Sequence, residues 1–551
     1  MSTRALSCHD ILEQIIRLLI RREVDENDNI IIHKQDVLTC ALTCRSFLGP
    51  ALSTLWYSLN SLVPLLKLLP NFKTQGDYYC LTGRIEEKDW SNFDSHAELV
   101  REFIYTDVDS PDHIVLPSVY LRLAQCRPKP LPHLMRFNCP CSTAAITETL
   151  LFLSPLLEKV EFKNVCSVAK RTNVEMFLSF LADESVQSLR SLYMDGNITK
   201  GLLSAICHFK HLRSLELIGG GTGSDNDLYE EDLVQVGTAL ENLTKFSLEA
   251  NLSPKPPASL SENPAKGPKF TAFANLTDLT LTGTPASITR VLQAITSDCI
   301  QKLEFHIPES TDSEQPHIQY IIFQAGSRWA TTITSLKFYL TNANGNESRG
   351  WGDDFSSSSD GDDNDSSGGK EDLSMGQFLR AIYQHQWPLL EVLTIDRAIG
   401  WACSDKDVSD LVSMWSKLRE LELSLNPPKH SQLPTILSLY TIAQGLPHLT
   451  SLRISLNLRY LPKDMTVTQV QSPTAFTPHR LHHLFIDSDH AGNDIVLLVH
   501  HLDTVFPYLH TLLGRRNAQS DWSEIQSILR LCQKVRASER RRMKAPAATF
   551  G

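Results

Sequence analysis

The sequence LRSLEL at residues 212–217 places three leucines in a fixed order, with two residues between the first pair and one between the second pair. Side chains in a strand alternate between the two faces of the sheet, so the second and third leucines share one buried face. The first leucine enters the core from the preceding turn. The same order of apolar residues recurs at Leu189/Leu192/Met194, Leu212/Leu215/Leu217, Leu243/Phe246/Leu248, Leu276/Leu279/Leu281, Ile300/Leu303/Phe305, Ile333/Leu336/Phe338, Leu390/Leu393/Ile395, Leu418/Leu421/Leu423, Leu449/Leu452/Ile454 and Leu481/Leu484/Ile486, with weaker copies from Val100, Leu134, Leu157 and Leu509.

Amphipathic helical stretches separate these trios. They cover residues 174–181, 230–240, 286–295, 376–383 and 408–415. The first apolar residues of successive trios lie 23 to 34 residues apart, except at one wide gap between Ile333 and Leu390. A short strand followed by a helix at this interval is typical of a leucine-rich-repeat solenoid, in which one repeat is stable only when stacked on its neighbours. We therefore predict an α/β fold that forms a loosely curved, irregular horseshoe.

A helical pattern precedes the repeats. Residues 6–20, LSCHDILEQIIRLLI, place apolar side chains on one side of a helix, and residues 36–56, DVLTCALTCRSFLGPALSTLW, predict two more helices. Arg45 and Ser46 interrupt the second stripe, and Pro50 is expected to open the third helix. The charged residues Arg21–Asn29 are expected to form a loop. Three helices within about 56 residues are too few for a comfortable core of their own, so a partner surface is expected.

The order of residues in this helical segment resembles the F-box, the module that docks a substrate receptor onto the Skp-type adaptor of a cullin-based ubiquitin ligase. The resemblance covers residues 6–58, with Ser7 where the family has proline. The matching residues are Leu6, Asp10, Ile11 and Leu12 in the first half, and Asp36, Cys44, Arg45, Leu55 and Trp56 in the second. The leucine-rich stretch at residues 59–70 is similar to an extension of fungal F-box proteins.

This resemblance implies an F-box/leucine-rich-repeat protein that acts as a substrate receptor in a ubiquitin ligase. Its partners would be a Skp-type adaptor, a cullin scaffold reached through that adaptor, and an unidentified target protein held by the solenoid. The adaptor-facing residues implied by the family are Leu6, Ile11, Leu12, Ile15, Leu38, Leu42 and Trp56.

The pattern predicts the following layout along the chain. An F-box-like domain spans residues 1–58, a linker with a leading helix spans 59–98, and the solenoid spans 99–532. An acidic disordered insertion, 341–372, interrupts the solenoid, and a basic disordered tail, 533–551, follows it. Ser357 and Ser359 each precede an acidic residue by three positions, which makes them candidates for an acidophilic kinase.

Residues that alternate with the buried leucines should point to the concave face of the sheet. Aromatic and arginine side chains commonly dominate binding to a protein partner at such a surface. The predicted target-binding residues are Tyr193, Glu216, Glu422, Arg453 and Phe485.

No motif in the sequence points to catalysis, a cofactor or a metal centre. The dense set from His479 to His490 lies partly within a repeat strand, whose alternation should disperse its side chains, so we predict no metal site there. No stretch has the length of a membrane span, and a net charge of -11 argues against nucleic acid as a partner. We expect a cytoplasmic or nuclear protein that is not an enzyme. Two alternatives stay open: a repeat scaffold with no role in ubiquitin transfer, whose N-terminal helices are a plain cap, and an enzyme whose site is assembled from distant residues.

Overall fold

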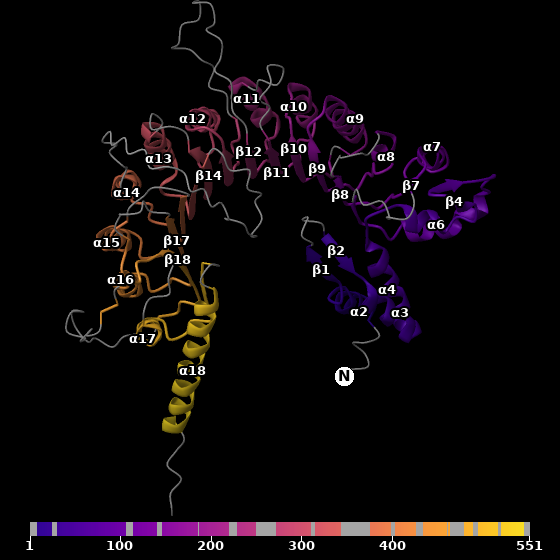
Figure 1. Ribbon diagram of the computed structural model, residues 1–551. Coiled ribbons are helices and arrows are strands. Elements are labelled where there is room, and N and C mark those ends of the chain that lie inside the picture. Colours follow the sequence, from indigo (N-terminus) through magenta and orange to yellow (C-terminus); the bar gives the residue numbers. More distant parts are fainter. Residues whose placement is uncertain are drawn as a thin grey trace, which may run out of the picture. The chain divides into compact units, whose positions relative to one another are not determined.

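The computed structural model (Figure 1) describes residues 8–24, 30–105, 114–139, 146–185, 187–219, 229–249, 272–309, 315–342, 375–397, 403–425, 433–459, 461–462, 479–488, 494–515 and 519–544. The chain divides into two compact units. The first comprises Met1–Leu276 with Ala294–Ser297, and the second comprises Thr277–Gln293 with Asp298–Gly551.

The first unit begins with a helical module, α2 (His9–Arg17), α3 (Gln35–Thr43) and α4 (Arg45–Tyr57). Its core contains Ile16, Val37, Ala41 and Ala51, against which four partly buried apolar side chains pack. This core is small, as the short apolar stripes predict. The module therefore has little apolar burial of its own to oppose the conformational entropy of unfolding.

Two local expectations for this module are wrong. The charged segment after α2 is not a plain loop, because β1 (Arg21–Val24) pairs antiparallel with β2 (Ile30–His33). Pro50 does not open the third helix but lies inside α4, which begins at Arg45 directly after the extended residue Cys44. A proline inside a helix costs one backbone hydrogen bond, and here the proline ring is buried in the module.

A parallel ladder follows in the first unit. Its strands run in the order β3 (Ser58–Leu59), β6 (Glu102–Ile104), β8 (Arg136–Cys139), β9 (Lys159–Val165), β10 (Ser191–Gly196), β11 (Ser214–Ile218) and β12 (Lys245–Glu249). A side sheet consists of β4 (Phe72–Gln75), β5 (Tyr78–Leu81) and β7 (Ile114–Val115). The connecting helices are α5 (Val63–Leu66), η1 (Glu87–Trp90), α6 (Ser91–Ala97), α7 (Pro117–Cys126), α8 (Ile146–Leu150), α9 (Val168–Ser185), α10 (Lys200–Ile206) and α11 (Glu230–Ala239).

The second unit repeats the same plan. Its parallel strands, in order, are β13 (Asp278–Thr282), β14 (Lys302–Glu309), β15 (Ser335–Asn342), β16 (Val392–Arg397), β17 (Glu420–Leu425), β18 (Ser451–Ser455), β19 (His483–Asp487) and β20 (Thr511–Gly514). Its helices are α12 (Pro285–Ala294), α13 (Gln315–Trp329), α14 (Met375–Tyr383), α15 (Asp405–Met414), α16 (Leu437–Gly445), α17 (Ile495–Val505) and α18 (Gln519–Lys544).

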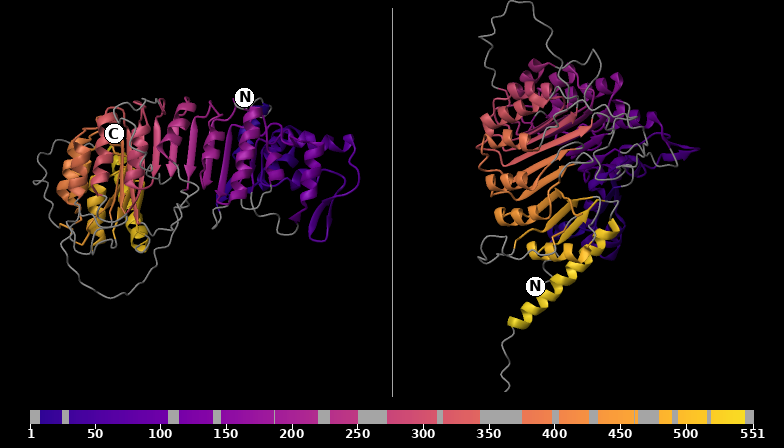
Figure 2. Two further views of the ribbon diagram at one scale, coloured as in Figure 1. Left: turned by 90° about the horizontal axis from the view of Figure 1, so that it is seen from above. Right: turned by 60° about the vertical axis from the view of Figure 1, so that its left-hand side comes forward.

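The apolar trios confirm the predicted strand positions. In β10, for example, Leu192 and Met194 are buried and alternate with half-buried residues. The register aligns Leu192 with Val160 of β9 and with Leu215 of β11, so equivalent apolar side chains form columns across the ladder. Within each unit the helices that connect successive strands lie along one side of those strands (Figure 2), which leaves the other side of the strands as a helix-free face. All five helical stretches predicted between the trios are helices.

The basic C-terminal segment departs from its expected disorder. Helix α18 continues to Lys544, and so includes every basic residue of the segment 533–551. The acidic insertion 341–372 falls almost wholly outside the described residues, as do Ser357 and Ser359.

Candidate protein-interaction sites

Helices α2 and α3 each carry an apolar row that their own core does not bury. On α2 the row is Ile11 and Ile15, continued by Leu18 directly after the helix, with exposed fractions of 44%, 45% and 84%, at the spacing i, i+4, i+7 of one helix face. On α3 it is Leu38 and Leu42, which are 43% and 80% exposed. Exposed apolar side chains are common when scattered, whereas here each of two packed helices carries a row of them.

The implied adaptor-facing residues therefore differ in how exposed they are. Ile11, Ile15, Leu38 and Leu42 are accessible on the surface of the module. Leu12, by contrast, is only 3% exposed, because it belongs to the neighbouring helix row that faces inward with Ile16.

Two further members of that implied set lie elsewhere. Trp56, near the end of α4, is half-buried, and its ring meets His96 of α6 edge-on at a centroid distance of 4.8 Å. Leu6 lies outside the described residues. Neither Leu12 nor Trp56 therefore belongs to the exposed apolar rows of α2 and α3.

Lys34 joins the helical module to the first strand of the ladder. Its Nζ donates to the carbonyl oxygens of Leu55 and Ser58 at 2.6 and 2.5 Å, where α4 ends. A cation at this place satisfies carbonyl groups that the helix leaves without partners. Burial lowers the pKa of Lys34 from 10.5 to about 8, and the negative charge of Glu102 acts in the opposite direction.

This lowered pKa predicts a pH dependence of stability. Between pH 8 and 10.5 the unfolded chain keeps the proton on Lys34 while the folded chain releases it, so the free energy of unfolding should rise with pH, by at most about 3 kcal/mol. Denaturant unfolding of wild type and Lys34→Met at pH 7.5 and 10 measures the effect. The wild type should gain more stability than the variant over this interval; equal gains would contradict the assignment.

A groove of about 360 Å³ lies between the helical module and the first repeats. It is lined by Glu13 and Arg17 of α2, Ser53 and Tyr57 of α4, and Leu99, Arg101 and Met135. Arg17 pairs with Glu13 at 2.7 Å and lies over the Tyr57 ring at 4.7 Å. The polar groups on this side of α2 thus interact with one another, on the side opposite to Ile11 and Ile15.

The helix-free face of the first unit brings two predicted target-binding residues together. Tyr193 of β10 and Glu216 of β11 are direct cross-strand neighbours. Glu216 also forms an ion pair with Lys245 of β12, whose Nζ lies 2.5 Å from Glu216 Oε1. Next to Tyr193, Glu161 of β9 accepts from Asn138 at 2.8 Å. The result is a polar surface built around one tyrosine.

The other three predicted target-binding residues form one row across the second unit. The register places Glu422, Arg453 and Phe485 side by side on β17, β18 and β19. Arg453 donates to Glu422 at 2.9 Å, and its guanidinium lies 4.5 Å from the centre of the Phe485 ring. These contacts fix the arginine in one orientation, which lowers the entropy that binding a partner would cost.

Sequence reasoning missed the polar residues beside this row. Asp396 of β16 lies next to Tyr339 of β15, whose ring stacks on His306 at 4.5 Å. Asp487, two residues beyond Phe485, accepts from Arg515 and Ser424. The outward-facing position of these residues could have been predicted, because each directly follows the last residue of a trio. Their contacts could not, because the partners come from other strands.

The electrostatics of this face follow from partial burial. Burial raises the pKa of Asp396, with Arg453 and a hydrogen bond from Ser424 opposing the rise. The pKa of Glu422 is also raised, first by burial and then by Asp396, while Arg453 and Lys337 lower it. Partly desolvated charges of both signs therefore adjoin on this face, as in surfaces that select partners by charge complementarity.

The histidine-rich segment near β19 has structural partners. His479 is buried and shares a hydrogen bond of 2.7 Å with the Leu446 carbonyl, and His482 packs its ring against His510. Among the described residues, no group of three or more His, Cys, Asp or Glu side chains is placed to hold a metal ion. His490 lies outside the described residues. In the same described part of the chain, no helix has the length and apolar content to cross a membrane.

The repeated parallel strands backed by helices define a solenoid of leucine-rich-repeat type. No protein-family model and no curated protein sequence matches the chain. Among solved structures, it is similar to a chain in the "Crystal structure of Rad7 and Elc1 complex in yeast", with 15% identity, a TM-score of 0.34, and coverage of 73% of this chain and 85% of that one. It is also similar to a chain in the "Crystal structure of TLR13-ssRNA13 complex", with 12% identity, a TM-score of 0.32, and coverage of 77% of this chain and 54% of that one.

Proposed function

We propose that this protein is a substrate receptor of a cullin-based ubiquitin ligase. Its F-box-like helical module binds a Skp-type adaptor, and the helix-free face of its repeats binds a target protein. The chain performs no chemistry itself. It holds the target near a ubiquitin-loaded enzyme, which replaces a bimolecular encounter by a local one. The proposal places the protein in the cytoplasm or nucleus.

The observation that carries this proposal is the pair of exposed apolar rows on the helical module. Ile15 and Leu42 each belong to a helix whose neighbouring row is buried, so both helices are apolar on more of their circumference than their own core needs. A helix that only capped the solenoid would be expected to present polar side chains to solvent. An adaptor helix that covered these two rows would explain why both rows are apolar.

The target-binding part rests on the ordered polar row of the second unit. Arg453 is held between Glu422 and Phe485, and further charges adjoin the row. A preorganised arginine beside an aromatic ring is the kind of anchor that dominates many protein interfaces. The corresponding anchor on the first unit is Tyr193.

Replacement of Ile15 and Leu42 by aspartate tests adaptor binding. Both side chains are exposed, so Ile15→Asp with Leu42→Asp should leave the module folded, whereas a charge at Leu12 would unfold it. Loss of two anchors should cost about 2 kcal/mol or more, which weakens adaptor binding by about 30-fold. The measurement is the affinity of the purified full chain for a Skp-type adaptor, by isothermal titration calorimetry.

Leu121→Asp is the matched control. This leucine is 52% exposed on α7 of the same unit, and its replacement introduces the same charge away from the helical module. The control should bind the adaptor like wild type. If wild type does not bind, or if the double variant binds as tightly as wild type, the chain is better described as a repeat scaffold with no role in ubiquitin transfer.

A further inference from the structure

Helix α18 is attached to the second unit through one side only. Trp522, Ile525 and Leu529 are almost fully buried and recur at helical spacing. Gly514 of β20 makes room for the Trp522 ring, since a Cβ at this glycine would lie 2.0 Å from Trp522 Nε1. These apolar contacts fix the first half of the helix against the last strand of the ladder.

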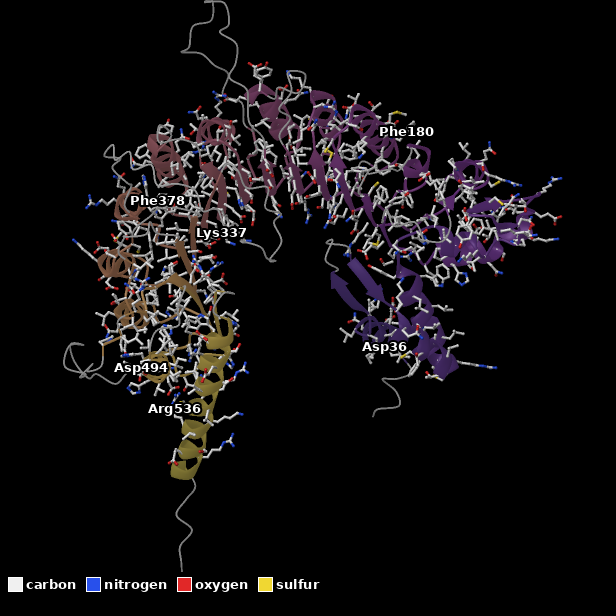
Figure 3. All side chains as sticks on the ribbon, in the orientation of Figure 1. Asp36, Phe180, Lys337, Phe378, Asp494 and Arg536 are labelled. Carbon is white, nitrogen blue, oxygen red and sulfur yellow. The ribbon has the colours of Figure 1, made fainter. Side chains whose placement is uncertain are left out.

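Polar contacts extend the attachment towards the middle of the helix. The side-chain amides of Gln526 and Gln533 donate to the carbonyl oxygens of His510 and Leu509 at 3.3 and 2.9 Å. Arg536 donates to the Pro507 carbonyl at 3.1 Å and pairs with Asp503. Arg536 is labelled in Figure 3, on the part of α18 that still adjoins the repeats.

A second apolar pair lies on the opposite side of α18. Leu531 and Val535 are 61% and 54% exposed and lie four residues apart. At 100° per residue they are displaced by roughly half a turn from the buried Leu529 and the docked Gln533. Leu531 and Val535 are therefore exposed because α18 packs on the repeats through its other side. Neither residue takes part in the contacts described above that hold the helix.

Basic residues adjoin this apolar pair. Residues 530–544 contain seven Arg or Lys and one Glu, in a chain whose net charge is -11. Arg530, Lys534 and Arg541 are exposed, and helical spacing places them on one flank of the Leu531–Val535 stripe. Basic residues in the last turn stabilise a helix through its dipole, but Arg530 and Lys534 lie too far from that end to act in this way.

The C-terminal end of α18 extends beyond the contacts that attach the helix. Eight residues, 537–544, follow the docked Arg536, which corresponds to about 12 Å of helix. Figure 2 shows this end of α18 extending away from the other elements of the second unit. Ala537, Ser538 and Glu539 are exposed.

We infer that the outer side of α18 is a docking surface for an acidic amphipathic helix of another protein. Leu531 and Val535 supply the apolar contact, and Arg530, Lys534 and Arg541 supply charge complementary to acidic side chains beside the partner's own apolar stripe. A nucleic acid would use the basic residues alone and leave both apolar side chains uncovered. This surface is separate from the proposed adaptor surface and does not depend on it.

Fluorescence anisotropy with the full chain tests this inference. The probe is a labelled helical peptide of about 21 residues with leucine at heptad positions a and d and glutamate on the flanks. We expect Leu531→Ser with Val535→Ser, which removes the apolar contact without adding charge, and separately Lys534→Glu with Arg541→Glu, to weaken binding by about tenfold or more. Val496→Ser, at a 72% exposed position of α17, is the control and should bind like wild type.

Two further probes separate apolar docking from simple charge attraction. One is the same peptide with its leucines scattered around the helix, and it should bind at least about tenfold more weakly. The other is a short DNA duplex, whose binding should not respond to Leu531→Ser with Val535→Ser, because this variant leaves the charge of the helix unchanged. The inference is overturned if the helical peptide does not bind, if both peptides bind equally, or if only the charge variant weakens binding of the peptide. Adaptor affinity should be unchanged in all these variants.

Discussion

Trp329→Ala is expected to lower the free energy of unfolding by about 3–5 kcal/mol. Trp329 ends α13 and is fully buried in the second unit. The Arg328 guanidinium lies 4.4 Å from the centre of the ring, and Arg328 also donates to the Leu292 carbonyl of the preceding helix at 2.7 Å. Removing the indole would leave a cavity between repeats that can collapse only in part, because each repeat depends on contact with its neighbours.

Denaturant unfolding followed by circular dichroism measures this loss. Tyr320→Ala is the matched control, since it removes an aromatic ring from the same helix at a position that is 44% exposed. The control should cost less than about 1 kcal/mol. Similar losses in the two variants would show that burial between the repeats does not set the stability of this unit.

Gly196→Ala should have the second large effect, through the backbone. Gly196 ends β10 with φ of +140°, a region that other residues rarely adopt. A Cβ at this position would lie 2.5 Å from the Val165 carbonyl oxygen of the neighbouring strand. Because the obstacle is backbone, neither strand can yield without loss of pairing. We expect a loss of about 3 kcal/mol or more in the free energy of unfolding.

Gly76→Ala separates the two causes of this effect. Gly76 also has positive φ, at +59°, but a Cβ there would meet no heavy atom within 4 Å. It should therefore cost only the backbone strain, roughly 1 kcal/mol. If both alanine variants lose the same stability in denaturant unfolding, the close approach of β10 to β9 has no energetic consequence.

The ladder could be predicted because its pattern is local. Each strand needs one buried face, so alternation within six residues identifies strands such as Leu212–Leu217 without knowledge of their neighbours. The helices between them follow from equally local periodicity. The pattern also identified Tyr193, Glu422 and Arg453 as residues on the helix-free face.

The contacts made by those residues could not be predicted in the same way. Arg453 meets Glu422 from 31 positions away, and its ring partner Phe485 comes from the opposite neighbouring strand. Register between repeats of unequal length decides these pairs. Asp487 illustrates the same limit, because its partners Ser424 and Arg515 belong to two other parts of the chain.

The helical module shows where local pattern fails. Leu12 and Ile11 are adjacent and similar, yet one is buried and the other is half exposed. A helix with apolar residues on more than one row does not itself specify which row faces inward. Packing of α2 against α4 decides which row faces inward. Pro50 lies inside α4, although the preference of proline for the first turn predicted that the helix would begin there.

The sequence by itself determined the strand–helix repeats, their buried columns and the outward-facing positions, because each follows from periodicity within a few residues. Tertiary structure alone decided which outward residues meet, which apolar row of α2 is exposed, and that most of the basic C-terminal segment is helical. The physical reason is that these outcomes depend on surfaces from distant parts of the chain. In α18, Trp522 and Leu529 bury one side against β20, and this fixes Leu531 and Val535 on the side that remains accessible.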